Sequence, residues 1–200
     1  MVYIALCSLI LGIICGQFIL GDTYHIILSD IADYVLYVLM FSVGISLGLN
    51  EQILDKIKNY NISILLIPLG VIIGSIFGGF ICSLILDIDL ASGLSIGSAM
   101  GWYSLSGVML ESLANSQIGT ISFLSSLMRE FIAFMLIPIF VKYLNPYTAI
   151  AAAGATSEDT TLPMLIKYTG EEFIIISVIN GALCSLAVPI LINFFFTILS

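Results

Sequence analysis

Two adjacent ionisable residues, Arg129 and Glu130, lie about midway along an apolar run. An ionisable side chain at the centre of a bilayer costs on the order of 3 kcal/mol on insertion scales, so it normally faces a cavity or a partner. Ser122 and Ser126 share one broad helix face with this pair, at i, i+3 and i+4 spacing. One interpretation is a buried ion pair with another helix. The other is a site in which Glu130 binds a substrate cation or a proton and Arg129 tunes its charge.

A second polar cluster, GATSEDTTLP at 154–163, interrupts the apolar sequence farther along. Gly154 and Pro163 are helix breakers, and the segment between them includes hydroxyl and carboxylate side chains. A hydroxyl N-cap followed by acids in the first turn would fit an ordinary cytoplasmic loop that opens a helix. The alternative is a cavity lining, in which the two acids bind cations or pair with Arg129. The predicted substrate contacts here are Thr156, Ser157, Glu158, Asp159, Thr160 and Thr161.

The third polar feature is GWYSLSG at 101–107, which contains the single Trp of the chain. An interfacial aromatic anchor is one interpretation of such a segment. Because the aromatic residues are embedded among glycines and serines, an unwound hairpin tip with aromatic walls is the other, and aromatic faces suit an ammonium ligand. We predict that Trp102, Tyr103, Ser104 and Ser106 contact the substrate, and that Arg129, Ser126 and Asn180 support the site.

Other patterns predict no further chemistry. GLSIG at 93–97 matches the hydrolase pattern G-x-S-x-G, but that motif needs a His base, and the single His, His25, falls in a predicted external loop. The four Cys residues lie inside apolar runs without paired spacing, so we expect neither disulfides nor a metal site. We also expect no cofactor and, since no basic patch is present, no nucleic-acid partner.

Small residues recur every four positions, a spacing that lets helices approach closely. We expect tight helix packing, without a substrate role, at the first three of these sets. The sets are Gly12/Gly16, Gly44/Gly48, Gly70/Gly74/Gly78 and Gly93/Gly97/Gly101.

The composition decides what kind of fold must position these residues. Hydrophobic residues make up 60% of the chain and charged residues 9%, too few to coat a water-soluble domain. Apolar runs of about 20 residues indicate an all-α integral membrane protein with a single transport domain over 1–200. Full spans are predicted at 2–20, 31–49, 62–86, 118–142 and 173–199.

Two segments, 90–113 and 147–168, are too rich in Gly, Ser and Thr to be ordinary spans. We predict that they are re-entrant hairpins entering from opposite faces, with tips that meet near the midplane. Irregular backbone at membrane depth is tolerated only inside protein or along a wet cavity, and secondary transporters build substrate sites from such broken helices.

The lysines predict the orientation of the chain. Lys56 and Lys58 follow the second span, so that loop should be cytoplasmic, with the N-terminus inside and the C-terminus outside. If both odd segments are hairpins, Lys142 and Lys167 are also inside; if both crossed fully, Lys142 would be outside. We therefore favour five spans and two hairpins over seven spans.

The motifs LMFSVGISLG (39–48), MGWYSLSG (100–107), MREF (128–131) and GATSEDTTLP (154–163) together resemble the lysine exporter family, and the likeness covers essentially the whole chain. The resemblance implies an inner-membrane exporter of basic amino acids, lysine above all, that depends on embedded acids, one of them matching Glu130. Fuller members also carry an N-terminal three-helix portion with another embedded acid, which this chain lacks. That portion could be a separate small subunit, or two copies of this chain could compensate.

The sequence, together with this resemblance, thus predicts a secondary active transporter subunit that exports a cationic amino acid, lysine by the resemblance, across the cytoplasmic membrane by proton antiport. A cation channel could use the same acids. An intramembrane enzyme is a weaker alternative, because the chain has no HExxH motif and no usable Ser/His pair. An inert half that only scaffolds a missing partner is a further alternative.

Overall fold

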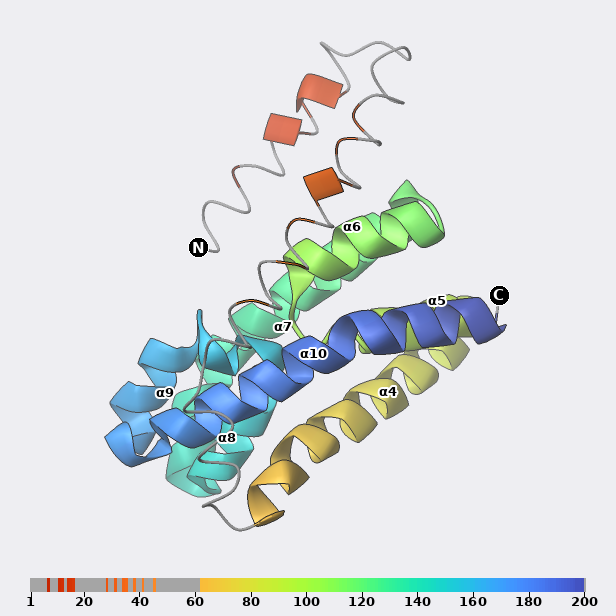
Figure 1. Ribbon diagram of the computed structural model, residues 1–200. Helices are drawn as coiled ribbons and strands as arrows, with labels where there is room; N and C mark the ends of the chain where they lie inside the picture. The colour runs from red at the N-terminus through yellow and green to blue at the C-terminus, as the bar shows by residue number, and fades with distance from the viewer. Residues whose placement is uncertain are drawn as a thin grey trace.

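The computed structural model describes residues 62–199 continuously, together with scattered positions between 7 and 45. The continuous part is helical throughout, apart from turns (Figure 1). The predicted spans at 2–20 and 31–49, and His25 between them, lie outside it. Its elements are η1 (Ile62–Leu65), α4 (Leu66–Leu86), α5 (Leu90–Gly97), α6 (Tyr103–Leu113), α7 (Ser116–Tyr143), α8 (Pro146–Ala153), η2 (Gly154–Glu158), α9 (Leu162–Thr169), η3 (Glu171–Phe173) and α10 (Ile174–Leu199).

Three helical stretches in this part are long and apolar enough to cross a membrane: Leu66–Leu86, Ser116–Tyr143 and Glu171–Leu199. They contain 21, 28 and 29 residues, and about 20 helical residues cover a bilayer core of roughly 30 Å. They coincide with three of the predicted spans. The prediction of an α-helical membrane protein is therefore confirmed.

The two Gly- and Ser-rich segments form broken helices. Asp89 caps α5 by accepting a hydrogen bond from the Ser92 backbone N–H at 3.0 Å. Between α5 and α6 the backbone unwinds over 98–102, where Met100 and Gly101 have φ of 47° and 99°. Only glycine adopts such angles at little cost, so Gly101 supports this break and Met100 is strained.

The second broken helix unwinds at Gly154, whose φ is 62°. Asn145 starts α8 by accepting from the Thr148 N–H at 2.8 Å, and Pro163 occupies the first turn of α9. Proline is tolerated there because the first N–H groups of a helix have no intrahelical partner. The sequence pattern of breakers therefore coincides with the observed breaks.

The two broken helices lie at opposite ends of the long helices (Figure 1). Gly93 of α5 packs against Ser83 near the end of α4, and Gly107 of α6 packs against Gly119 near the start of α7. By contrast, α8 and α9 pack with the second half of α7 and the start of α10, through a buried cluster of Ile137, Ala149, Ile150, Ala153, Leu165 and Ile176.

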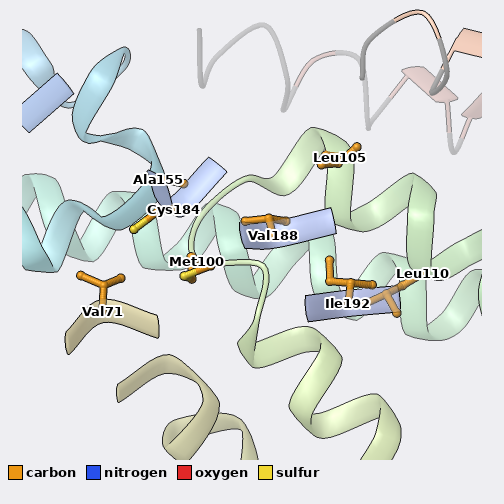
Figure 2. Packing of buried hydrophobic residues seen from close by; sticks show 8 residues of the cluster. All are labelled: Val71, Met100, Leu105, Leu110, Ala155, Cys184, Val188 and Ile192. Atoms are coloured by element: carbon orange, nitrogen blue, oxygen red, sulfur yellow. The ribbon is translucent and has the colours of Figure 1, made fainter. Parts of the chain in front are cut away.

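The two breaks meet in the interior, between these ends. The Ala155 N–H in the second break donates to the Met100 carbonyl in the first at 3.1 Å. Figure 2 shows Met100 and Ala155 close to Cys184 of α10, inside a cluster that also contains Val71, Leu105, Leu110, Val188 and Ile192. Residues from three helices, α4, α6 and α10, and from both breaks thus share one core.

The glycines of α4 divide into two groups. A Cβ added to Gly70, Gly74 or Gly78 would meet no atom of the described chain within 4 Å, so none of the described residues packs tightly against these three glycines. A Cβ at Gly79 would lie 2.5 Å from the Gly93 carbonyl oxygen. The close contact between α4 and α5 therefore involves Gly79, on the helix face next to the one that carries Gly70, Gly74 and Gly78.

Candidate functional site

Glu130 is buried in α7 with a relative exposure of 1%. Neither of its carboxylate oxygens has a hydrogen-bond donor in the part of the chain that the structure describes. The Thr160 hydroxyl lies near the carboxylate, but the two do not form a hydrogen bond of normal geometry. Glu130 also interacts electrostatically with Tyr103 and Asp159. One acid of a long helix is therefore placed beside both broken helices.

The two acids of the second break differ in environment. Glu158 is half-buried and accepts a hydrogen bond from the Ser185 hydroxyl of α10 at 2.7 Å. Its backbone packs closely on Gly181, where an added Cβ would lie 2.6 Å from the Glu158 nitrogen. Asp159 is exposed and accepts from the Thr160 backbone N–H. Glu158 is therefore fixed against α10, whereas Asp159 remains accessible.

Arg129 does not pair with these acids in the described structure. Its Nη1 donates to the Ser75 hydroxyl of α4 at 3.0 Å instead. The predicted pairing with Glu158 or Asp159 is therefore not seen among the described residues. Residues 129 and 130 point about 100° apart around the helix, so Arg129 contacts α4 whereas Glu130 lies near Asp159.

Three of the predicted substrate-binding hydroxyls hold the second break together. The Thr156 hydroxyl donates to the Ala153 carbonyl at 2.9 Å, and the Thr161 hydroxyl donates to the Thr156 carbonyl at 2.9 Å. The Ser157 hydroxyl is 2.8 Å from the carbonyl oxygens of both Gly154 and Ser177. These bonds replace the helical ladder lost at the break, so the three side chains shape the tip.

Asn180 of α10 completes this network. Its buried amide Nδ2 donates to the Ser157 hydroxyl at 2.9 Å and to the Gly154 carbonyl at 3.1 Å. The predicted supporting residue thus ties the second break to a long helix.

We expect Asn180→Ala to lower the thermal unfolding temperature of the detergent-solubilised chain by several degrees. The substitution removes both hydrogen bonds and leaves the buried Ser157 oxygen without a donor, at a cost of about 1–3 kcal/mol. Asn193→Ala is the matched control, because Asn193 is an exposed residue of the same helix. Equal unfolding temperatures for the two variants would show that the Asn180 hydrogen bonds do not stabilise the second break.

The residues of the first break do not share one environment. Trp102 packs against the core cluster, and the Tyr103 ring meets Phe123 edge-on with centroids 5.4 Å apart. Ser104 is exposed, whereas the Ser106 hydroxyl is buried without a hydrogen-bond partner among the described residues. Of this group, Tyr103 lies near Glu130.

A cavity of about 300 Å³ lies between α4, α5 and α7. Its walls are mainly glycine and serine, including Ser83, Ser125 and the predicted supporting residue Ser126, with Gly101 at the first break and Arg129 as its charged group. A second, more open hollow of about 500 Å³ is lined by residues of α4, α7 and α8, again including Arg129. Pockets of this size with a few convergent polar groups are typical of small-molecule sites.

Sequence reasoning missed Ser75, Ser83 and Ser125. For Ser75 and Ser83 the signal was the small-residue spacing of α4, which was assigned to helix packing; Ser125 belongs to α7. No group of three His, Cys, Asp or Glu side chains could share a metal ion within the described residues.

Comparisons with known proteins point to one family. The family model described as lysine exporter LysO matches residues 6–196. Lysine exporter LysO of Escherichia coli (strain K12) is 37% identical over 191 residues, which cover 91% of this chain and 62% of that protein. A putative lysine exporter of Haemophilus influenzae (strain ATCC 51907 / DSM 11121 / KW20 / Rd) is 37% identical over 168 residues, covering 81% of this chain and 82% of the relative.

The chain thus spans a little under two thirds of the length of the Escherichia coli relative. No solved structure matches it significantly. The family match extends over nearly the whole chain and confirms the resemblance carried by the four motifs. This chain belongs to the lysine exporter LysO family.

Proposed function

We propose that this chain is the transport subunit of a secondary active exporter of lysine or a related cationic amino acid in the cytoplasmic membrane. The observation that carries the proposal is Glu130, a fully buried carboxylate without a donor in the described part of the chain. An ionised carboxylate in such a place is costly unless it is paired, so it requires either a proton or a bound cation.

That requirement suits exchange of a proton for a lysine ammonium group. With substrate bound, Glu130 would be ionised and paired; after release, a proton would neutralise it. Proton entry would then drive lysine export. The relatives bear the names lysine exporter and putative lysine exporter, which supports lysine as the cation.

The proposed membrane arrangement has five spans and two re-entrant hairpins, 90–113 from outside and 147–168 from inside, within a single transport domain. Supporting it, α5 and α6 lie at one end of the long helices, α8 and α9 lie at the other, and the breaks meet between them. The N-terminus would be inside and the C-terminus outside.

The proposed substrate site lies where the two breaks approach Glu130. Tyr103, Asp159 and Thr160 are near this carboxylate and would surround the ammonium group. Trp102, Ser104, Ser106 and Glu158 would form the outer contacts. Thr156, Ser157 and Thr161 would contribute through the shape of the break that they stabilise.

The length of the Escherichia coli relative supports a further element of the proposal. A small subunit equivalent to the N-terminal portion of longer members, or a second copy of this chain, would complete the transporter.

Counter-flow of labelled lysine into lysine-loaded liposomes tests the proposed function. We expect saturable uptake by the chain alone or with the N-terminal portion of a longer family member added. A channel would show flux without saturable counter-flow. Absence of lysine counter-flow in both preparations would contradict the proposal.

Proton exchange is tested separately in the same liposomes. With lysine inside and a more acidic exterior, we expect faster lysine efflux and alkalinisation of the exterior, because each departing lysine admits protons. Efflux that is indifferent to an imposed pH gradient, with membrane voltage clamped, would rule out proton antiport.

A further inference from the structure

Arg129 is a cation without an acidic partner in the described structure. A guanidinium has five N–H donors, and the bond from Nη1 to Ser75 is the one that the structure places on another side chain. The group lies where α4, α10 and the second break converge: Nη2 is 2.9 Å from the position of a Cβ on Gly154, and Cys184 is in electrostatic contact. A cation inside a membrane protein is stabilised by an anion, and the described residues supply none here.

Arg129 and Ser75 line both hollows of the described chain. The 300 Å³ cavity continues from them along Gly78, Gly79 and Cys82 toward Leu86 at the end of α4. The 500 Å³ hollow continues the other way along α4, past Gly74, Val71 and Gly70. These positions follow one another on one face of α4. The two hollows therefore form one track along this face, and the bond between Ser75 and Arg129 lies at the point where they adjoin.

We propose that Arg129 binds the α-carboxylate of the transported amino acid. This inference rests on the proposed function, in which Glu130 binds the ammonium group, and it assigns a partner to the other charged group of the substrate, the carboxylate. The planar guanidinium fork matches a carboxylate bidentately, which the Ser75 hydroxyl cannot do. The glycine and serine walls leave room for the ligand to approach.

The substrate carboxylate replaces the Ser75 hydroxyl as the acceptor of the Arg129 hydrogen bond. The bond that lies between the two hollows is then broken, and the hollows are connected. Substrate recognition and opening of the track become one event. A cation that lacks a carboxylate leaves the Ser75–Arg129 bond in place and therefore binds more weakly.

Four ligands separate the two charges in a binding assay on the purified full chain: lysine, lysinamide, norleucine and norleucinamide. The amides lack the carboxylate, and the norleucine pair lacks the side-chain ammonium. We expect the wild-type chain to bind each acid roughly tenfold or more tightly than its amide, the usual worth of a charge-assisted hydrogen bond. In Arg129→Gln that ratio falls to near one, whereas in Lys142→Gln, an exposed cation of the same helix, it is unchanged.

Ser75→Ala keeps the positive charge of Arg129 and removes the hydroxyl that competes with the substrate carboxylate for the guanidinium. We expect lysine to bind several-fold more tightly to this variant while lysinamide binding is unchanged. An acid-to-amide ratio that survives Arg129→Gln, or an equal effect of Ser75→Ala on lysine and lysinamide, overturns the carboxylate site and leaves lysine export intact. Conversely, an Arg129-dependent preference for norleucine over norleucinamide without lysine binding supports the carboxylate site and contradicts the lysine function.

Discussion

Glu130→Gln is expected to weaken lysine binding by about ten- to a hundredfold and to abolish proton-driven export. Glutamine has the same shape but neither charge nor a titratable proton, so it cannot pair with an ammonium group or exchange that group for a proton. The loss of a charge-assisted hydrogen bond accounts for the binding effect. The measurement is lysine counter-flow and pH-driven efflux in liposomes.

The same variant should unfold at an equal or higher temperature than the wild-type chain. The native carboxylate has no donor among the described residues, so its replacement by a neutral amide removes an uncompensated charge. Loss of transport with unimpaired stability would distinguish a binding role from a structural one. Glu172→Gln, which changes an exposed acid, is the control and should transport normally. Full export activity of Glu130→Gln would refute the proposed role.

Gly79→Ala is expected to destabilise the protein strongly, although it adds a single methyl group. The new Cβ would lie 2.5 Å from the Gly93 carbonyl oxygen and 3.1 Å from the Gly97 Cα. Both neighbours are backbone atoms of α5, so α4 and the first broken helix would have to separate. Overpacking of this kind costs about 1–3 kcal/mol, and separation of the helices would add to it.

The neighbouring substitution Gly78→Ala provides a matched control. An added Cβ there meets no described atom within 4 Å, and alanine favours a helix over glycine by about 0.5–1 kcal/mol. Thermal unfolding in detergent should therefore rank Gly78→Ala at or above the wild type and Gly79→Ala well below it. If the two variants unfold alike, α4 and α5 do not pack as described.

Much of the architecture follows from local sequence. Long apolar runs specify the membrane helices of 66–86, 116–143 and 174–199, because a bilayer accepts few other structures. The breaks also follow from local signals: Gly101 and Gly154 adopt positive φ, and Pro163 begins α9. The ionisable side chain of Glu130 within an apolar run was the local signal behind its predicted role.

The uses of the polar side chains depended on tertiary structure. Thr156 and Thr161 belong to a polar segment that resembles a binding site, yet their hydroxyls donate to nearby carbonyl oxygens of the second break. Arg129 was expected to meet acids some 30 positions away in the sequence, but it bonds to Ser75 on another helix. Sequence spacing cannot predict such pairs, because they depend on how each helix is rotated and where it crosses its neighbours.

The sequence by itself determined the class of the protein, the positions of its membrane helices in the described part, their breaks, and the buried acid. Hydrophobicity, backbone preference and the cost of a buried charge are local properties, so they can be read residue by residue. Only the tertiary structure decided which glycines of α4 pack on α5 and which do not, and that Arg129 lines two hollows. Those outcomes require contacts between segments far apart in the chain, where a rotation of one residue around a helix exchanges a packed face for an open one.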